Sequence, residues 1–405
     1  MKIAFISYEF PPDTGKGGIG TYVKQIAAAM ADCNMDVHVF AGSNQRTATE
    51  KMDGYQVHWM MCNNGNDFKT KVVNSFQALH NIAPFDLMES PEIGGNAWEV
   101  KKNFLYVPLV VRLHAPDYLV ESLKKKYVPF FAKLRFVLGA FRRLKWDMGY
   151  WRKYKKENDA DYQFIQLANY ITAPSAAMKH WAVKNWKIVP EKISVIPNIF
   201  LPPTALLQIP IYQHPQYKRI VFFGRLNVLK GLVNASKAMK KILQEYPEWK
   251  FRVIGDDGNG PYTGISMRNW MKDQLKPVIQ QVEFLDGMVY EALPAAMADA
   301  EIVLLPSLFE SFSYTCAEAM AAGKAVVGSK FSGMADMITD GENGLLIDAA
   351  NETDIYSAIQ LLIQNDKARY RMSVQAREII QNKYSAGELS YRFMDFYKHV
   401  SVQHA

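Results

Sequence analysis

Two carboxylates, Glu310 and Glu318, stand in one segment that directly follows the apolar run Ile302–Leu305. The backbone amides of residues 311–313 would open a short helix of small residues, and the N-terminus of a helix suits a phosphate group. A buried carboxylate needs hydrogen-bond donors, which the hydroxyls of a ribose would supply to Glu318. The segment therefore indicates a site for a phosphate and a sugar, with capping of a neighbouring loop as the alternative role of Glu318.

Two cations follow another apolar run. Arg225 comes just after the run Arg219–Phe223, and Lys230 stands five residues further on. A strand end would deliver Arg225 into a cleft, and the following loop would place Lys230 beside it. Two fixed cations suit a diphosphate, whose negative charge grows as it leaves. Taken alone, each cation would fit a solvated surface role better.

A glycine-rich stretch, residues 15–20, matches the GxGxxG pattern of dinucleotide sites. Five residues separate it from the first strand, and no acidic residue ends the second strand, so a nicotinamide or flavin oxidoreductase is disfavoured. We expect a longer mobile loop instead, in which Gly17 and Gly18 let backbone amides approach an anion before a helix that starts at Thr21. A flexible solvent loop is the alternative.

Short β-branched runs alternate with amphipathic stretches such as Thr21–Ala31 and Val233–Glu245, which predicts parallel sheets covered by helices on both faces. The pattern starts twice, and clustered prolines between residues 197 and 215 predict a linker. We therefore expect two doubly wound α/β domains with a ligand at the carboxyl ends of their strands, in a cleft between them. The predicted strands are Lys2–Tyr8, Asp36–Phe40, Tyr55–Met60, Leu105–Leu113, Tyr170–Thr172, Lys192–Ile196, Arg219–Phe223, Lys250–Ile254, Val282–Phe284, Ile302–Leu305 and Ala325–Val327.

The composition of the 405 residues, 49% hydrophobic and 21% charged, excludes a disordered or fibrous protein. Three cysteines lie far apart without a CxxC pair, which excludes a disulfide scaffold and a cysteine zinc site and suits a reducing compartment. The first residues read as a strand rather than a signal peptide, and no apolar run approaches the ~20 residues of a spanning helix. We expect a cytoplasmic protein, with peripheral attachment to the inner face of a membrane left open.

The net charge of +7 is concentrated in residues 118–156, where 12 lysine and arginine residues face two acidic ones. A helix in this segment would have an apolar face, with Arg135, Arg142 and Arg143 mostly opposite. Three interpretations stay open: an anionic membrane interface, packing on the first domain, and an acidic glycan site. Nucleic-acid binding is disfavoured because the charge is local. The apolar face comprises Phe130, Leu134, Val137, Leu138, Phe141, Leu144 and Met148, and the aromatics Trp146, Tyr150 and Trp151 follow.

The chain resembles a family-four glycosyltransferase of the GT-B type. In the first domain, the Gly17-Gly18 pair and His114 match this family. The resemblance is weak between Asp117 and Asp159, and Pro197-Asn198-Ile199 stands where relatives often have Pro-Asn-Gly. In the second half it is carried by Gly224-Arg225-Leu226, Lys230-Gly231, Phe284–Gly287, Glu310–Glu318, Ala321–Gly328 and Gly341–Leu346.

The resemblance implies a GT-B fold of two Rossmann-like domains facing across a cleft: an acceptor-side domain, 1–200, and a donor-binding domain, 215–385. A C-terminal helix, about 386–405, would return to the first domain. The activity implied is a metal-independent, retaining hexosyltransferase without a cofactor, which moves a sugar from a nucleotide diphosphate donor, UDP- or GDP-linked, to a hydroxyl acceptor. The acceptor would be a glycan, a lipid-linked or a small molecule, in glycan, polysaccharide or glycolipid synthesis.

The same resemblance assigns roles to residues. Arg225 and Lys230 would hold the diphosphate, Glu318 the ribose, and Glu310 would lie against the donor sugar. The amides of Ser311, Phe312 and Ser313 would touch the sugar or phosphate, and Gly17 and Gly18 would close on the diphosphate. The catalytic set would be His114, Glu310, Arg225 and Lys230.

Two further acidic residues, Glu89 and Glu92, follow a predicted strand that ends at Asp86–Met88. They would face the acceptor, or serve at the surface or as caps. No metal site is expected: Asp256-Asp257 and Asp299–Glu301 fit turn and cap roles better. The competing functions are a sugar-nucleotide epimerase of the same fold and a catalytically silent sugar-nucleotide-binding protein. The donor sugar, the acceptor and the oligomeric state are left open.

Overall fold

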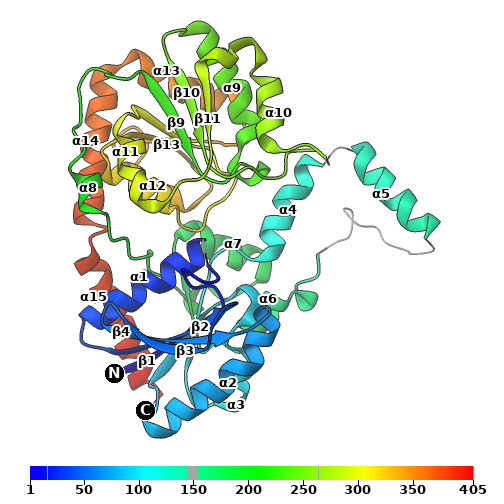
Figure 1. Cartoon of the computed structure of the whole chain (residues 1–405), viewed down its shortest axis with the longest axis vertical. Helices are drawn as coiled ribbons and strands as arrows, with labels where there is room; N and C mark the ends of the chain where they lie inside the picture. Colours follow the sequence, from blue (N-terminus) through cyan, green and yellow to red (C-terminus); the bar gives the residue numbers. More distant parts are fainter. Residues whose placement is uncertain (16, 129, 144–153, 263, 405) are drawn as a thin grey trace. The chain divides into compact units, whose positions relative to one another are not determined.

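The computed structural model describes residues 1–15, 17–128, 130–143, 154–262 and 264–404 (Figure 1). The chain forms two compact units, each built around its own sheet. Unit 1 comprises Met1–Asp117, Lys155–Leu201 and Lys383–Ala405, and unit 2 comprises Tyr118–Tyr154 and Pro202–Asn382. The segment Tyr118–Tyr154, which the sequence analysis placed in the first domain, groups with unit 2.

The strands and helices alternate along most of the chain, as the hydrophobic pattern predicts. The strands are β1 Lys2–Ser7, β2 Asp36–Ser43, β3 Ala48–Met52, β4 Tyr55–Met61, β5 Leu87–Pro91, β6 Leu109–Arg112, β7 Tyr170–Ala173, β8 Ile193–Val195, β9 Arg219–Phe223, β10 Lys250–Ile254, β11 Val282–Leu285, β12 Ile302–Leu305, β13 Ala325–Ser329 and β14 Leu345–Ile347. The α-helices are α1 Gly18–Asp32, α2 Gly65–Ile82, α3 Trp98–Asn103, α4 Asp117–Tyr127, α5 Phe130–Arg142, α6 Ala160–Ile165, α7 Ala176–Trp186, α8 Thr204–Leu207, α9 Leu232–Glu245, α10 Met267–Gln274, α11 Leu293–Ala298, α12 Tyr314–Ala321, α13 Glu352–Gln364, α14 Asp366–Asn382 and α15 Ala386–Val402.

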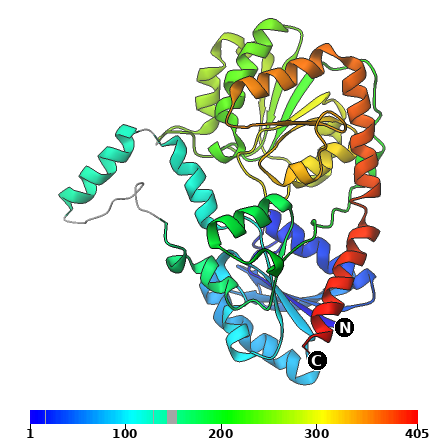
Figure 2. The same ribbon diagram turned by 180° about the vertical axis from the view of Figure 1, so that it is seen from behind.

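Sheet A of unit 1 has the strand order β3-β4-β2-β1-β5-β6-β7-β8. Its strands pair in parallel except β3, which pairs antiparallel with β4. The chain therefore reverses its direction of winding between β1 and β5, so that α1 and α2 cover opposite faces. The helix α15 lies beside α1 in both views of the ribbon (Figures 1 and 2).

Two strands, β3 and β14, are not among those predicted from the sequence. Asp53 and Gly54, which connect β3 to β4, both have positive φ, 41° and 86°. An Asp-Gly pair in this conformation is the usual two-residue hairpin turn. The signal was therefore present in the sequence. The period-2 alternation of polar residues in β3 gave no apolar run to mark a strand.

Sheet B of unit 2 has the order β11-β10-β9-β12-β13-β14, and every neighbouring pair is parallel. Helix α9 contacts both α10 and α13 in one layer, while α12 packs on α14. The winding reverses between β9 and β12, which are neighbours in the sheet. In such sheets a ligand binds at this reversal, beyond the carboxyl ends of the strands.

Several predicted boundaries differ from the structure, and three of the differences lie next to predicted site residues. The predicted strand Leu105–Leu113 begins only at Leu109, and Leu105 and Tyr106 are exposed. The strand predicted to end at Met88 continues as β5 to Pro91, so Glu89 lies inside it rather than after it. The first helix begins at Gly18, three residues before Thr21.

A buried ionic cluster connects α15 to sheet A. The carboxylate of Glu89 accepts hydrogen bonds from the hydroxyls of Tyr22, at 2.6 Å, and Tyr397, at 2.7 Å. The guanidinium of Arg112 stacks on Tyr22 and Phe393 and donates to the carbonyl oxygen of Ile196. Burial raises the pKa of Glu89, and Arg112 opposes that shift. The C-terminal helix is thus held in unit 1 by both aromatic packing and charge.

In the described part of the chain, no helix is long and apolar enough to cross a bilayer. The cysteines Cys33, Cys62 and Cys316 are free thiols, and the last two are buried.

Replacing Tyr397 by Phe tests the ionic cluster. The variant keeps the ring but removes one donor to a buried carboxylate, which should lower the free energy of unfolding by about 1–3 kcal/mol. Urea unfolding followed by circular dichroism measures the change. The control is Tyr391→Phe, an exposed tyrosine on the same helix, for which we expect no measurable shift. Equal effects of the two substitutions would contradict the account.

Candidate active site

The loops after β9 and β12 meet at the winding reversal of sheet B. Gly231, after β9, has a left-handed φ of 69°. A Cβ atom placed on it would lie 1.7 Å from the carbonyl oxygen of Pro306, at the end of β12. The amide of Leu308 also donates to the carbonyl oxygen of Leu229, at 2.8 Å. Because only glycine permits this approach, the two loops lie backbone to backbone.

This approach brings together two residues that the sequence analysis assigned to one site. Lys230, the last residue of the short helix η5 (Val228–Lys230), forms an ion pair with Glu310. The hydroxyl of Ser307 donates to the same carboxylate at 3.0 Å. Both side chains of the pair keep part of their surface exposed, at 30% and 20%. Arg225 follows β9 on the same side of the sheet and is exposed.

The short helix α12 begins in the same place. Ser313 is its N-cap, and the hydroxyl of Ser313 accepts the amide of Cys316 at 3.2 Å. Phe312 is buried, and Ser311 lies half-buried beside it. The helix ends before Gly323, whose φ of 63° is the left-handed conformation common just after a helix C-terminus. The N-terminus of α12 therefore lies in the loop that carries Glu310.

Glu318 is the fifth residue of α12, little more than one turn from its start. Glu318 is only 9% exposed to solvent. The hydroxyl of Tyr290, in the short helix η7 (Tyr290–Ala292), donates to its carboxylate. Burial raises the pKa of Glu318 to about 7, and this hydrogen bond opposes the shift. The structure thus contains a nearly buried carboxylate whose donor comes from a partly exposed loop.

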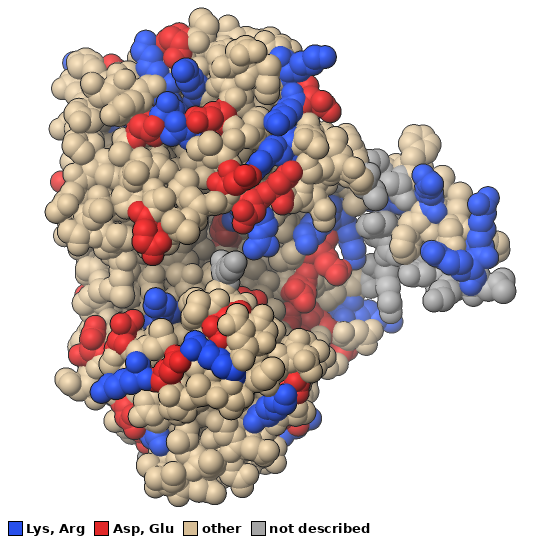
Figure 3. Space-filling view, in the orientation of Figure 1, with Lys and Arg blue, Asp and Glu red and all other residues tan. Residues whose placement is uncertain are grey.

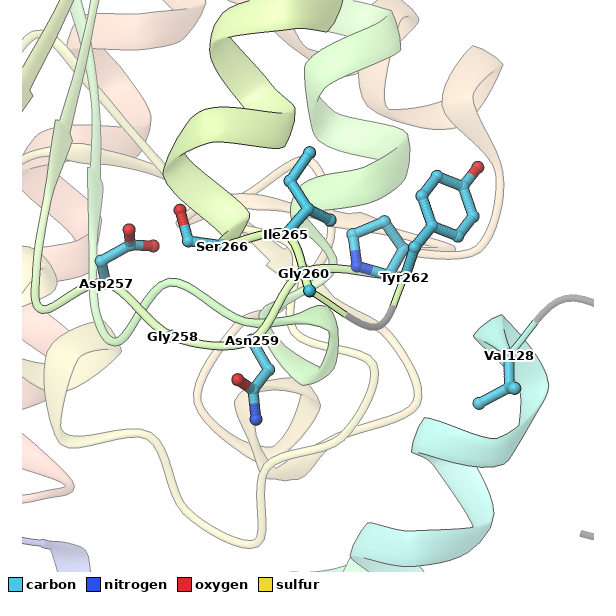
Figure 4. Close-up of a pocket in the computed structure, with 10 residues that line it drawn as sticks. Val128, Asp257, Gly258, Asn259, Gly260, Tyr262, Ile265 and Ser266 are labelled. Atoms are coloured by element: carbon cyan, nitrogen blue, oxygen red, sulfur yellow. The ribbon is translucent and has the colours of Figure 1, made fainter. Parts of the chain in front are cut away.

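A glycine-rich loop after β10 completes this edge of sheet B. A Cβ on Gly255 would lie 2.0 Å from the carbonyl oxygen of Gly224, so this loop also packs directly on the loop after β9. Figure 4 shows the stretch Asp257–Ser266 around an open hollow of about 560 Å³, with Val128 on its far side. The hollow is lined by none of the predicted donor-site residues.

In unit 1, the four glycines of the first loop divide into two kinds. A Cβ on Gly15 would lie 2.8 Å from the amide nitrogen of Phe10, and one on Gly20 would lie 3.1 Å from Pro11, so packing accounts for these two. A Cβ on Gly17 would only approach Glu9, at 3.8 Å, and one on Gly18 would meet nothing within 4 Å. Gly17 and Gly18 therefore leave space at the N-terminus of α1 that the protein itself does not use.

His114 lies two residues after β6 and is buried, with Tyr22 edge-on to its ring at 5.4 Å between centroids. Both carboxylate oxygens of Glu92 accept its backbone amide, at 2.8 and 2.9 Å. The Nε2 atom of His114 has no hydrogen-bond partner among the described residues. Burial lowers the pKa of His114 to about 3, with Arg112 adding to the shift, so the ring is neutral near pH 7.

A small cavity of about 250 Å³ lies at the winding reversal of sheet A, between the ends of β1 and β5. None of its lining residues was predicted as a site residue, although the carboxyl-end rule for parallel sheets points to this place. Its polar lining includes Tyr8, Glu9, Asn64, Asn66, Lys69 and Asn96.

Two family models match the chain, one for each half. The model described as Glycosyltransferase Family 4 matches residues 16–200, and the model described as Glycosyl transferases group 1 matches residues 209–379. The chain belongs to the family-four GT-B glycosyltransferases.

Individual relatives of this glycosyltransferase are distant. A D-inositol 3-phosphate glycosyltransferase from Corynebacterium diphtheriae is 22% identical, over 94% of this chain and 91% of its own. Among solved structures, sucrose-phosphate synthase from Thermosynechococcus elongatus superposes with a TM-score of 0.71 at 17% identity, covering 100% of both chains. HepE from Anabaena, solved in complex with UDP, superposes with a TM-score of 0.68 at 20% identity, covering 98% of this chain and 100% of its own.

The residues predicted on the acceptor side of this glycosyltransferase, Glu89 and Glu92, are both buried in unit 1. Glu89 bonds two tyrosines, and Glu92 holds the backbone of His114. In these contacts the two carboxylates hold neighbouring side chains and backbone of unit 1 in place. Contact of either carboxylate with an acceptor stays a prediction.

Within the described residues, no three His, Cys, Asp or Glu side chains gather as a metal ion would require. Three of the acidic residues for which turn and cap roles were expected have protein partners. Asp257 accepts the amide of Arg268 at 3.0 Å. Asp299 pairs with Arg219 and Arg252, and Glu301 accepts the amide of Tyr217 at 3.0 Å.

The raised pKa of Glu318 predicts a stability change with pH. The folded state binds this proton more tightly than the unfolded state does, so the contribution of Glu318 to stability falls as the pH rises from about 4.5 to about 7. Glu318→Gln should therefore stabilise the glycosyltransferase at pH 8, on the order of 1–3 kcal/mol, and much less at pH 5. Thermal unfolding at both pH values measures this.

The matched control is Glu291→Gln, an exposed carboxylate in η7. We expect it to leave the difference between the two pH values unchanged. A Glu318→Gln protein that is less stable than the wild type at pH 8 would contradict the prediction.

Proposed function

We propose that the protein is a retaining glycosyltransferase that moves a sugar from a nucleotide diphosphate sugar to a hydroxyl acceptor, without a metal ion or another cofactor. The observation that carries this proposal is the convergence at the winding reversal of sheet B. Lys230, Glu310 and the N-terminus of α12 meet there, with Glu318 one turn further along the helix. A cation and a helix N-terminus suit the diphosphate, and a carboxylate suits the ribose.

In the proposed complex, the diphosphate takes the cation that Glu310 now holds. Lys230 and the exposed Arg225 bind its oxygens, while the amides of Ser311–Ser313 contribute the positive end of the α12 dipole. Glu310, released from Lys230, accepts hydrogen bonds from hydroxyls of the donor sugar. The diphosphate and the carboxylate of Glu310 thus compete for the ammonium group of Lys230.

Glu318 binds the ribose in this proposal. Its carboxylate already receives one hydroxyl, from Tyr290, which shows that its geometry accepts such a donor. Two vicinal ribose hydroxyls would satisfy the carboxylate more fully than one tyrosine, and would favour its ionised form. The nucleotide base would then lie toward the loop of η7. The UDP held by Anabaena HepE in its crystals supports a nucleoside diphosphate, with UDP and GDP as the first candidates here.

The transfer itself is a front-face displacement in this proposal. The bond between the anomeric carbon and the phosphate oxygen breaks, and the acceptor oxygen bonds to the same face of the sugar. The acceptor proton passes to the departing phosphate oxygen, so no side chain needs to act as a covalent nucleophile. Lys230 and Arg225 stabilise the charge on the leaving group, and the transition state is oxocarbenium-like.

His114 supports this chemistry as a neutral ring. Its lowered pKa keeps it uncharged, and its Nε2 atom has no partner in the described part of the chain. A hydrogen bond from a ligand would stabilise a buried nitrogen that lacks a partner. We propose that a sugar hydroxyl forms this hydrogen bond, as donor or acceptor. Gly17 and Gly18 leave space at the N-terminus of α1 for an anionic group, for which we propose the diphosphate.

The acceptor is proposed to bind in the 250 Å³ cavity of unit 1. The side-chain amides of Asn64, Asn66 and Asn96 can pair with several hydroxyls, and Lys69 can pair with an acidic group. These groups suit a polyhydroxylated acceptor that carries a negative charge. The name of the D-inositol 3-phosphate glycosyltransferases supports this class. Transfer in glycan, polysaccharide or glycolipid synthesis is the broader setting we propose.

Nucleotide binding tests the donor site. UDP, GDP and ADP are added separately without metal, and the matching nucleotide should stabilise the protein by about 2.7 kcal/mol at 100 times its dissociation constant. Glu318→Ala should raise the dissociation constant of that nucleotide at least tenfold, because the ribose hydroxyls lose their hydrogen-bond acceptor. Lys230→Ala should lower kcat about 10²–10³-fold. The control Lys276→Ala, an exposed lysine outside the site, should change neither value.

Stabilisation by no nucleotide in a folded sample would overturn the donor site. Wild-type kinetics in both site variants would show that the residues were wrongly assigned.

The stereochemistry and the metal requirement are tested on the reaction itself. With the matching nucleotide sugar and an acceptor, NMR of the first product should show the anomeric configuration of the donor, and turnover should be unchanged in EDTA. An inverted product would exclude the front-face route. Release of the free epimeric sugar nucleotide, without transfer, would favour the epimerase instead.

A further inference from the structure

The helix α5 (Phe130–Arg142) carries an apolar stripe that is open to solvent. Phe131 is 80% exposed, Leu134 39%, Leu138 55% and Phe141 66%. Their spacings of three, four and three residues place them on one face of a helix. Ala140, which falls on the opposite face, is buried. Leu134, Leu138 and Phe141 belong to the apolar face predicted from the sequence, whereas Phe131 does not. All four side chains are exposed rather than packed into a core.

Basic side chains border this stripe. Arg135 and Arg142 were predicted to lie mostly opposite the apolar face, but with Phe131 in the stripe their helical positions fall beside it. Both are exposed. Lys124 and Lys126, near the end of α4, are exposed as well, while Lys125 pairs with Glu121. Figure 3 shows blue lysine and arginine side chains over α5 beside tan surface, which carries no Lys, Arg, Asp or Glu. The predicted members Leu144, Trp146, Met148, Tyr150 and Trp151 lie outside the described residues.

We propose that the α5 stripe, defined as Phe131, Leu134, Leu138 and Phe141, inserts into the surface of an anionic membrane. A helix of 13 residues is too short to span a bilayer but suits the interface, with its apolar face in the acyl boundary. Arg135 and Arg142, at the edge of the stripe, reach lipid phosphates while their stems stay on the apolar side. The remaining lysines and arginines of residues 118–143 add long-range attraction to the negative surface.

The charge pattern favours lipid over the other occupants. A second copy of the chain would cover the stripe, but it would bring a second set of like charges against Arg135 and Arg142. An acidic glycan would bind the cations and leave two phenylalanines and two leucines in water. An anionic bilayer satisfies both the apolar stripe and the charges around it. The inference uses a surface outside the donor site and does not depend on the proposed sugar transfer.

Vesicle sedimentation of the full chain tests the apolar contribution. The wild type should pellet with vesicles of phosphatidylcholine and phosphatidylglycerol, and much less with phosphatidylcholine alone. The triple variant Phe131→Ser, Leu138→Ser, Phe141→Ser should lose most of the pelleting. The matched control replaces three exposed apolar residues elsewhere in the chain, Ile82→Ser, Leu105→Ser and Val402→Ser, and should pellet like the wild type.

The second arm tests charge. Arg135→Gln and Arg142→Gln should each weaken partitioning into anionic vesicles about fivefold, and the loss should shrink at high salt. Lys51→Gln and Lys276→Gln, both exposed and outside the segment, provide the control. All variants should keep the wild-type melting temperature and nucleotide binding, because none of the substituted residues is buried.

Equal pelleting of the wild type with and without phosphatidylglycerol would overturn the proposal, as would wild-type pelleting of the triple serine variant. Sedimentation velocity without lipid adds a further check. A dimer that the triple serine variant breaks into monomers would assign the stripe to a second copy and overturn the lipid proposal. A monomer in both cases would support it.

Discussion

The proposed donor site of unit 2 depends on one close approach of two backbones. The position of Gly231 leaves no room for a side chain, because the carbonyl oxygen of Pro306 occupies that place. This contact holds the loop after β9 against the loop after β12, two strands that lie 79 residues apart in the chain yet side by side in the sheet. The pairing of Lys230 with Glu310 and the position of the α12 N-terminus both follow from it.

Buried polar groups in this protein divide by how fully they are satisfied. Glu89 receives two tyrosine hydroxyls and serves the packing of α15, and Glu92 is occupied by the backbone amide of His114. Glu318 receives a hydroxyl from a tyrosine on a partly exposed loop, and the Nε2 atom of His114 receives nothing from the described residues. Desolvation makes an incomplete set of hydrogen bonds unfavourable. Glu318 and His114 are among several buried groups with an incomplete set of hydrogen bonds, and a ligand that completed the set would stabilise them.

The segment around α5 follows a different physical rule from the two sheets. In both units, the apolar side chains of the strands and of the covering helices are buried between sheet and helices. There the amphipathic pattern of the sequence agrees with the observed burial. In α5 the same helical pattern is present, but Phe131 and Phe141 stay in water and arginines border them. An amphipathic face does not by itself say what covers it. Here charge, rather than the hydrophobic pattern, distinguishes a membrane from a protein core.

The sequence by itself determined the two sheets and most strand positions, and it singled out Lys230 and Glu310, which the structure brings together. Local rules sufficed there, because periodicity, helix caps and the type of residue after a strand act over a few positions. Only the tertiary structure decided which carboxylates are buried and which residues form hydrogen bonds with them. Glu89 lies in a strand and accepts a hydrogen bond from Tyr397 on a helix far along the chain. Tyr290 donates to Glu318, 28 residues away in the sequence. Only the structure, too, revealed the cavity at the end of β1, whose lining comes from separate loops. Desolvation and hydrogen-bond partnership depend on contacts between residues far apart in the chain, and no local pattern encodes them.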